Sequence, residues 1–169
     1  DKEITSLNTA CVPQTYYGKT KLEGDLSIIN AKIKSIILRF PGIWGLKGPN
    51  HLGINLAINN AIKKKLIPTL IGDGLGKRNY IFVKDAAKCI VDAALNNREG
   101  IFICAPKEHI PIKYMLSKIN IEFMNYYNLN HLNADIKIKD KLYIGNYNWI
   151  KFLGFEEAIK LEKKINSIK

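Results

Sequence analysis

Two short apolar runs constrain the fold of this chain more than any other feature. They are KSIILRF at 34–40 and GIFICA at 100–105, and neither alternates with polar residues. An alternating strand has one solvated face, whereas a strand that is apolar throughout is typical of a parallel sheet with both faces covered. Helical patterns lie between the two runs, so we expect a parallel α/β sheet.

Hydrophobic periodicity predicts the helices around these strands. At 16–30, Leu22, Leu26 and Ile29 fall on one stripe. At 51–66, the predicted apolar stripe is Leu52, Leu56, Ile58 or Asn59, and Ile62. Further helices are expected at 85–95, 110–119 and 153–168.

Three other segments complete the expected secondary structure. Residues 67–83 read as a strand, a glycine turn and a second strand, inserted at the end of the sheet. Asp85 is expected to be the N-cap of the helix that follows. The stretch 120–148, rich in Asn and Tyr, shows no pattern that predicts an element.

Composition excludes several classes of protein. The mean hydropathy is −0.09, no apolar run approaches the ~18 residues of a membrane span, and no signal peptide opens the sequence. We expect a cytoplasmic protein that does not bind membranes. The cysteines Cys11, Cys89 and Cys104 are odd in number and widely spaced, so we expect reduced core thiols and no metal site.

The net charge of +11 raises the possibility of a nucleic-acid binder. The excess is almost all lysine, because Arg39, Arg78 and Arg98 are the arginines of the chain. The lysines are also scattered, and arginine is the better reader of phosphates and bases. We therefore expect a solvated basic surface and no nucleic-acid partner. A nucleic-acid binder, the alternative, would lose affinity steeply with salt.

Tyrosine followed four residues later by lysine is a spacing with chemical interest. With 8 tyrosines among many lysines, it is expected about once by chance. Tyr17/Lys21, Tyr80/Lys84 and Tyr114/Lys118 show it. Residues four apart share one face of a helix but lie about 13 Å apart on a strand, so the Tyr80 pair, expected on a strand, is excluded. Tyr114 has no chemical group expected around it, which leaves Tyr17 and Lys21.

A tyrosine beside a lysine can act as a base near neutral pH. The ammonium one turn away favours the phenolate and lowers the tyrosine pKa from its usual value of about 10. A bound cationic nicotinamide would lower it further. The phenolate could then take the proton of a sugar or alcohol hydroxyl while hydride leaves the same carbon. The lysine could also donate hydrogen bonds to ribose hydroxyls of the cofactor.

The sequence around this pair resembles the extended short-chain dehydrogenase/reductases, the NAD-dependent nucleotide-sugar epimerase/dehydratase family. VPQTYYGKTKLEGD at 12–25 is similar to the family's active-site helix. ILRFPGIWG at 37–45 resembles its strand and loop, with Trp44 in place of the usual tyrosine. IGDGLGKRNYIFVKDAAKCI at 71–90 resembles its Gly-Asp-Gly turn, the strand after it and the next helix. FLGF at 152–155 is a weaker likeness to a C-terminal Leu-Gly-Trp.

The resemblance implies roles for individual residues. Tyr17 would be the catalytic acid/base, and Lys21 its partner on the nicotinamide ribose of NAD or NADP. Phe40 and Pro41 would pass beside the nicotinamide. The implied substrate contacts are Gly42, Asn50, His51 and Arg78. No metal is implied.

Alternatives stand beside these roles. Arg78 would hold the nucleotide diphosphate, or else be a solvated turn residue. His51 would lie near the same phosphates, or else only begin a helix. Many epimerases of the family carry an asparagine where this chain has Gly42, which weakens an assignment to UDP-hexose epimerases.

The resemblance also implies the architecture and its limits. The fold class would be α/β, the C-terminal part of a Rossmann-type doubly wound parallel sheet plus a small mixed α/β substrate-binding domain. Residues 1–48 and 83–106 would end the Rossmann domain, and 49–82 and 107–169 would form the substrate-binding domain. The family's glycine-rich dinucleotide turn, its ribose-binding acid and a catalytic Ser or Thr are expected upstream of Asp1.

The implied function is NAD(P)-dependent epimerisation or dehydration of a nucleotide-activated sugar. A nucleotide-4-keto-sugar reductase and a non-catalytic binding relative are the alternatives. We expect a homodimer or association with the missing N-terminal half, and no activity from residues 1–169 alone.

Overall fold

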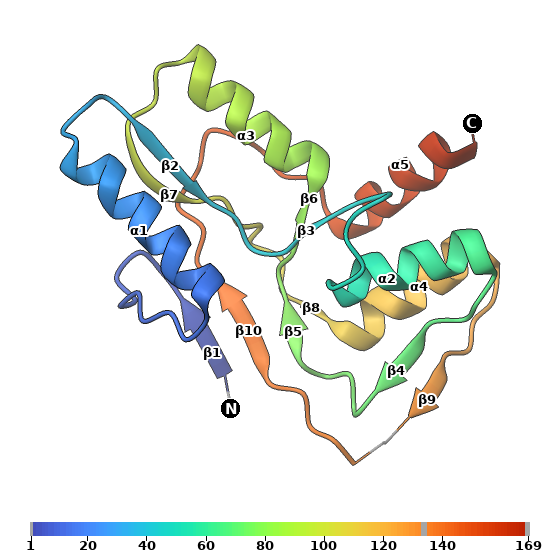
Figure 1. Ribbon diagram of the computed structural model, residues 1–169. Helices are drawn as coiled ribbons and strands as arrows, with labels where there is room; N and C mark the ends of the chain where they lie inside the picture. Colours follow the sequence, from blue (N-terminus) through green and yellow to red (C-terminus); the bar gives the residue numbers. More distant parts are fainter. Residues whose placement is uncertain (1, 133–134, 168–169) are drawn as a thin grey trace.

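The two apolar runs pair as the sequence predicts. The computed structural model describes residues 2–132 and 135–167. Strand β2 (Ile36–Arg39) runs parallel to β7 (Gly100–Ile103), with Ile36 opposite Gly100 and Arg39 opposite Ile103. In the view of Figure 1 this pair runs between helices α1 (Tyr16–Asn30) and α3 (Val83–Leu95). The predicted parallel α/β arrangement is confirmed.

The other strands are short and mostly parallel. They are β1 (Lys2–Thr5), β3 (Ile43–Trp44), β4 (Thr69–Ile71), β5 (Lys77–Arg78), β6 (Ile81–Phe82), β8 (Ile110–Pro111), β9 (Asn130–Leu132) and β10 (Asp140–Tyr143). One sheet has the order β1-β10-β5-β8, while β3 pairs with β6 and β4 with β9. Among the described residues, only the β5–β8 pair is antiparallel.

The segment 67–83 differs from the expected strand, turn and strand. Its strands β4, β5 and β6 form, but none pairs with another strand of the same segment. Gly72 and Gly74 have positive φ, which makes the turn between β4 and β5 sharp. The strands after the turn are carried to more distant partners, β10 and β3. Local turn residues could not reveal these partners.

All five predicted helices form. Besides α1 and α3, they are α2 (Gly53–Asn59), α4 (Ile112–Met124) and α5 (Phe155–Ser167). Helix α2 continues into a π-helical turn, η1 (Asn60–Lys64), which ends where Lys65 adopts left-handed backbone angles. The helix expected at 51–66 is therefore shorter and irregular.

The predicted apolar stripe of α2 is wrong at Leu56, whereas Ile58 and Asn59 are buried and Leu52 and Ile62 pack against the core. Leu56 is 40% exposed, whereas Ile54, Ile58 and Ala61 are buried. These three follow i, i+4, i+7 spacing, which also defines one helical face. The sequence offered two overlapping stripes, and packing against α4 selected the second.

The expected N-cap role of Asp85 is also wrong. Phe82 occupies the N-cap position, and Asp85 lies within the first turn of α3. Its side chain is buried and accepts hydrogen bonds from the backbone N–H of Leu153 at 2.8 Å and from Lys88 at 2.9 Å. Asp85 therefore ties a distant segment of the chain to α3.

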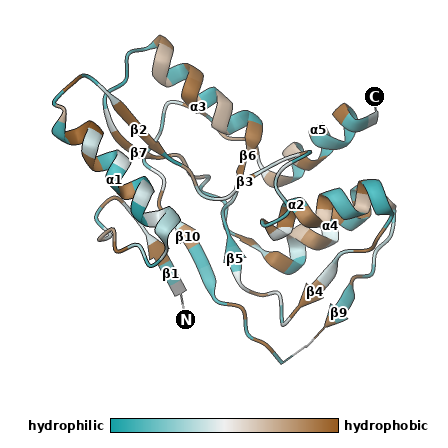
Figure 2. Ribbon diagram, in the orientation of Figure 1, coloured by the Kyte–Doolittle hydropathy of each residue, from teal (hydrophilic) through white to brown (hydrophobic). Residues whose placement is uncertain are grey.

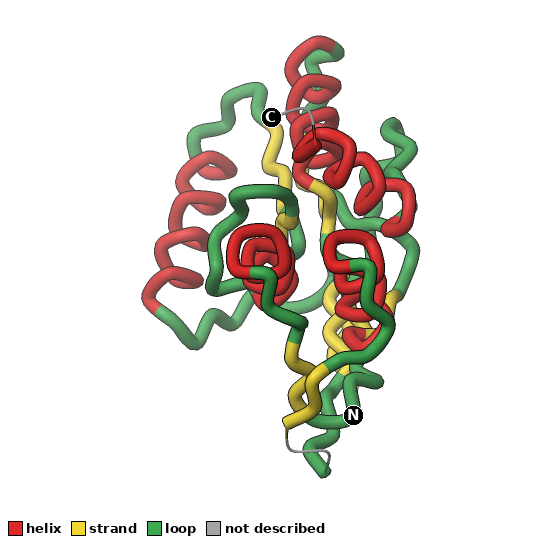
Figure 3. The backbone as a smooth tube through the Cα atoms, turned by 90° about the vertical axis from the view of Figure 1, so that its right-hand side faces the viewer, coloured by secondary structure: helices red, strands yellow, loops and turns green. Residues whose placement is uncertain are grey.

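Buried apolar residues form two clusters. The larger joins α2, α4 and α5 around Trp44, whose ring lies 5.0 Å from that of Phe82 and 5.2 Å from that of Phe155. The smaller lies under α3 and includes the free thiols of Cys89 and Cys104. Cys11 is exposed, so the expectation of a core thiol is wrong there. In the side view of Figure 3, helices lie on both sides of the strands.

Helix α1 presents an apolar stripe that no described element covers. None of its residues is buried, and Leu26 and Ile29 are 46% and 44% exposed. Figure 2 shows hydrophobic residues along the helix. The helix was therefore predicted correctly, and its apolar stripe stays largely exposed in the described part of the chain.

Candidate active site

The start of α1 is fixed by local interactions. Thr15 is the N-cap, and its hydroxyl accepts a hydrogen bond from the N–H of Gly18 at 3.1 Å. A Cβ at position 18 would lie 2.9 Å from the Cβ of Pro13. Only glycine lets the proline approach this closely, and the approach sets the direction in which the first turn leaves the loop.

Tyr17 and Lys21 lie one turn apart on α1. The ammonium nitrogen of Lys21 is 5.3 Å from the centre of the Tyr17 ring. The Tyr17 side chain is 73% exposed, and neither side chain has an acidic partner among the described residues. The phenol is therefore accessible and next to a cation.

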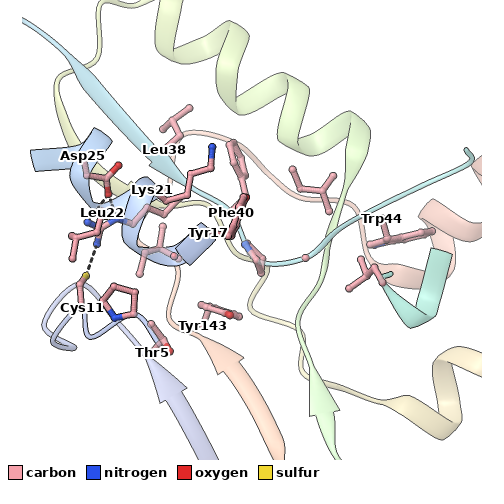
Figure 4. Close-up of a pocket in the computed structure, with 18 of the residues that line it drawn as sticks. Thr5, Cys11, Tyr17, Lys21, Leu22, Asp25, Leu38, Phe40, Trp44 and Tyr143 are labelled. Atoms are coloured by element: carbon pink, nitrogen blue, oxygen red, sulfur yellow. Dashed lines mark hydrogen bonds and ion pairs between the residues drawn. The ribbon is translucent and has the colours of Figure 1, made fainter. Parts of the chain in front are cut away.

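Both residues line a cavity of about 1120 Å³. Its walls come from α1, the segment between β2 and α2, the start of α3, and strands β1 and β10. Figure 4 shows Tyr17 and Phe40 near the middle of the cavity, Tyr143 below them and Trp44 at the far end. Segments distant in sequence meet around the Tyr-Lys pair, as an active site requires.

Some predicted substrate and cofactor residues line this cavity and others do not. Phe40, Pro41, Gly42 and His51 are among its lining residues. Asn50 is not: its side-chain oxygen accepts a hydrogen bond from Asn59 at 2.7 Å.

Arg78 also lies outside the lining. Its guanidinium donates to the carbonyl oxygens of Lys77 and Lys139 at 2.8 and 2.7 Å. The roles of Asn50 and Arg78 in substrate binding stay predictions.

Sequence analysis missed several cavity residues. Arg39 donates to one oxygen of Asp25 through Nε at 2.9 Å and through Nη2 at 2.8 Å. The sulfur of Cys11 accepts from the same guanidinium at 3.6 Å, as the dashed lines in Figure 4 show. Tyr143 also lines the cavity, and it comes from the stretch 120–148 that showed no pattern.

Tyr143 is held firmly at the cavity. The buried side chain of Asn79 accepts from the N–H of Tyr143 at 3.0 Å and donates to its carbonyl oxygen at 2.7 Å. The Asn79 amide also donates to the carbonyl oxygen of Pro106 at 3.0 Å. A single buried amide thus joins β10 to the segment after β7.

The other Tyr-Lys pairs have different surroundings. The hydroxyl of Tyr114 donates to Glu156, which also pairs with Lys118 at 2.9 Å. The carboxylate raises the pKa of Tyr114, so that tyrosine stays protonated. Tyr147 and Lys151 form a fourth pair with this spacing, which sequence analysis missed, and both lie outside any helix. Burial and a hydrogen bond to Asp92 raise the pKa of Tyr147.

Three glycines near the site serve packing. Gly42, Gly45 and Gly48 have the spacing Gly-x-x-Gly-x-x-Gly, which sequence analysis did not weigh. A Cβ on each would lie 2.8 Å from Tyr80, 2.6 Å from Val83 and 2.4 Å from Asn55, respectively. Strand β3 also interrupts the run. These glycines do not form a strand-to-helix turn of the kind that holds a dinucleotide.

The described residues were also searched for metal sites and for membrane-spanning helices. No group of three or more His, Cys, Asp or Glu side chains within 2–132 and 135–167 could hold a metal ion. None of the described helices is long and apolar enough to cross a membrane.

Residues 1–104 match the sequence model of a family described as the NAD dependent epimerase/dehydratase family. None of the curated proteins matches this chain. The three motif blocks of the sequence all fall within the matched range.

Several solved structures share the fold. UDP-glucuronic acid 4-epimerase from Bacillus cereus, in complex with NAD, is 19% identical with a TM-score of 0.76, over 99% of this chain and 57% of that one. UDP-N-acetylglucosamine 4-epimerase from Methanobrevibacter ruminantium, in complex with UDP-N-acetylmuramic acid, is 20% identical with a TM-score of 0.77. The match covers 99% of this chain and 64% of that one. dTDP-glucose 4,6-dehydratase from Bacillus anthracis, in complex with NAD, is 16% identical with a TM-score of 0.74. The match covers 96% of this chain and 55% of that one. The chain therefore spans little more than half the length of these proteins.

Proposed function

The chain belongs to the NAD dependent epimerase/dehydratase family, and from this premise we propose that it carries the catalytic helix and substrate-binding part of an NAD(P)-dependent epimerase or dehydratase of nucleotide-activated sugars. The observation that carries the proposal is the Tyr17/Lys21 pair, exposed in a large cavity and free of an acidic partner among the described residues. Similar structures are of nucleotide-sugar epimerases, one of them in complex with NAD, which supports the same class of ligand here.

The residues at the cavity fit the nicotinamide end of such a cofactor. Lys21 is within reach of the Tyr17 ring and offers donors to ribose hydroxyls. Phe40 and Pro41 line the cavity beside this pair and offer a flat apolar surface for a ring. A bound nicotinamide would supply hydride transfer at the sugar carbon. The fit concerns this end only, because no strand leads into a helix through a glycine turn for the pyrophosphate within residues 2–132 and 135–167.

Tyr17 is proposed to move the proton. Tyr17 is 73% exposed and lines a cavity large enough for a sugar, where a carbinol hydroxyl could reach it. The nearby ammonium of Lys21 favours the phenolate, which accepts that proton and returns it when the step reverses. Lys21 thereby has two tasks, stabilising the phenolate and orienting the cofactor ribose.

We propose that the diphosphate lies toward Arg78, Asn50 and His51, away from the Tyr17 end. His51 lines the cavity and precedes α2. To bind phosphate, Arg78 would have to give up a hydrogen bond to a backbone carbonyl oxygen. Its planar guanidinium can then donate two hydrogen bonds to phosphate oxygens. The division into a Rossmann part (1–48 and 83–106) and a substrate-binding part (49–82 and 107–169) belongs to the same proposal.

The test is binding and turnover by the full-length protein. UDP-glucose, UDP-N-acetylglucosamine and dTDP-glucose should be titrated by calorimetry in the presence of NAD, and products followed by NMR. Binding of at least one with conversion at a sugar carbon is expected. Conversion of a 4-keto sugar alone would favour a reductase, and binding without conversion of any sugar would favour a non-catalytic relative. Absence of binding to all of them would contradict the proposal.

A further inference from the structure

We propose that the sugar on the nucleotide is uncharged, a neutral hexose and not a hexuronic acid, an inference that rests on the proposed function. The question arises because the similar structures include enzymes named for both kinds of sugar. The two kinds differ at one group, a hydroxymethyl or a carboxylate, and a buried carboxylate needs a positive or hydrogen-bonding partner.

The Nε–Nη2 edge of Arg39 is already occupied by a carboxylate of this chain, that of Asp25. Two of its nitrogens bind the same oxygen of Asp25, at 2.9 and 2.8 Å, and a third donates to the sulfur of Cys11. Arg39 and Asp25 are both largely shielded, with side-chain exposures of 30% and 23%. A shielded and hydrogen-bonded pair of this kind is costly to separate.

Lys21 is the other permanent cation that lines the described part of the cavity. Its ammonium lies 5.3 Å from the Tyr17 ring centre and is the group proposed to favour the phenolate. A substrate carboxylate on Lys21 would offset that positive charge and weaken the base. The same lysine therefore cannot serve both purposes well.

The cavity also carries acids of its own. Glu3 and Asp25 line it together with Lys21 and Arg39, so acids and bases balance there, although the whole chain has a net charge of +11. Glu3 is only loosely paired, at 3.7 Å from Lys141. The local field therefore offers no attraction for an additional carboxylate.

The wall beyond Tyr17 is apolar. Gly42 presents only backbone, and the space a side chain would need is filled by Tyr80 and Leu52. Ile43 and Trp44 continue the wall toward the far end of the cavity. A carboxylate against Ile43 and Trp44 would lose hydration without gaining a cationic partner from them, whereas the C–H face of a neutral sugar packs well on this apolar surface.

UDP-glucose and UDP-glucuronic acid test the inference directly, because they share nucleotide and ring and differ only at C6. Both are titrated by calorimetry into the full-length protein with saturating NAD, with UDP alone as the reference. We expect UDP-glucuronic acid to bind at least about tenfold more weakly than UDP-glucose.

A matched pair of variants tests whether an added positive charge in the cavity strengthens the binding of UDP-glucuronic acid. Ile43 lines the cavity and is 39% exposed, so a long side chain can be placed there with little strain. Ile43→Arg should improve UDP-glucuronic acid binding by about tenfold without the same gain for UDP-glucose. Ile43→Gln, similar in reach but uncharged, should not.

Equal or tighter binding of UDP-glucuronic acid by the wild-type protein would overturn this inference and leave the proposed function standing. A protein that binds neither sugar nor UDP would overturn the proposed function, and this inference with it.

Discussion

Tyr17 and Tyr114 show how the surroundings of one residue decide its chemistry. Each has a lysine four residues later on a helix. Beside Tyr114, a carboxylate takes the phenol's hydrogen bond and the lysine's charge, and it raises the pKa of the phenol. Beside Tyr17 no described acid intervenes, so the lysine acts on the phenol alone. Of these two pairs, the Tyr17 pair is therefore the one that we propose as the acid/base.

Replacing Tyr17 by Phe removes the proposed acid/base and keeps the ring. In the full-length protein, turnover should fall by about 10²–10⁴, the usual worth of a positioned acid/base, while nucleotide-sugar affinity stays nearly unchanged. Steady-state rates and calorimetry measure the two effects. Tyr16→Phe is the matched control, because Tyr16 is adjacent, 88% exposed and outside the cavity lining. Near-normal turnover of Tyr17→Phe would exclude the assignment.

Arg78 has two possible tasks, which one variant can separate. If it grips the diphosphate, Arg78→Ala should weaken nucleotide-sugar binding by about 1.5–3 kcal/mol, and Arg78→Lys should recover only part. If it only braces the carbonyl oxygens of Lys77 and Lys139, the variant should lower the urea midpoint and leave affinity unchanged. Calorimetry and urea unfolding on the same preparation distinguish the two.

At the scale of elements, side chains hold a long irregular segment in place. Between β10 and α5 the chain has no regular structure. Tyr147 donates to Asp92 at 2.6 Å, Leu153 to Asp85 at 2.8 Å, and the first residue of α5, Phe155, to Glu108 at 3.0 Å. These carboxylates come from α3 and from the segment after β7. Buried polar contacts replace the backbone pairing that a strand would have.

Asn79 is the corresponding contact at β10. Asn79→Ala would leave the backbone groups of Tyr143 and the carbonyl oxygen of Pro106 without their partner. We expect a loss of at least about 1–3 kcal/mol in the free energy of unfolding, measured by urea titration. Asn79→Asp keeps the acceptor but loses the donor, so it should also destabilise. Stability equal to wild type in both variants would mean that the contact is not made.

The Tyr147–Asp92 contact should make stability depend on acid pH. Hydrogen bonds from Tyr147 and then Arg98 lower the pKa of Asp92 in the folded protein. The contact therefore stabilises the fold above the usual aspartate pKa of about 3.9, and this contribution is lost as the pH falls through the lowered value.

The melting temperature should show this directly. Tyr147→Phe should melt below wild type at pH 7, and the difference should shrink below about pH 4. Tyr127→Phe, at a site 74% exposed, is the control and should show no such trend. A difference independent of pH would assign the loss to packing alone.

At the scale of the whole molecule, we propose that the chain holds one end of a dinucleotide site. The glycines with the suggestive spacing are used for packing, and no other turn leads a strand into a helix through glycines in the described residues. A few hydrogen bonds from Tyr17 and Lys21, at about 0.5–1.5 kcal/mol each, do not offset the entropy lost on binding.

Residues 1–169 by themselves should therefore bind NADH no more tightly than about 1 mM and catalyse nothing. A fluorescence titration of the purified chain with NADH measures this. Micromolar binding would reveal a dinucleotide site elsewhere in the chain.

The sequence by itself determined the parallel β2–β7 pair, the positions of five helices, and the choice of Tyr17 and Lys21. These follow from local apolar patterns and from the geometry of four residues on a helix. The tertiary structure decided which face of α2 is buried, where Asp85 points, and that Tyr143 reaches the cavity. It also placed a carboxylate beside Tyr114, whereas none of the described carboxylates contacts Tyr17. Such contacts join residues tens of positions apart, and their energies depend on packing and desolvation that no local pattern records.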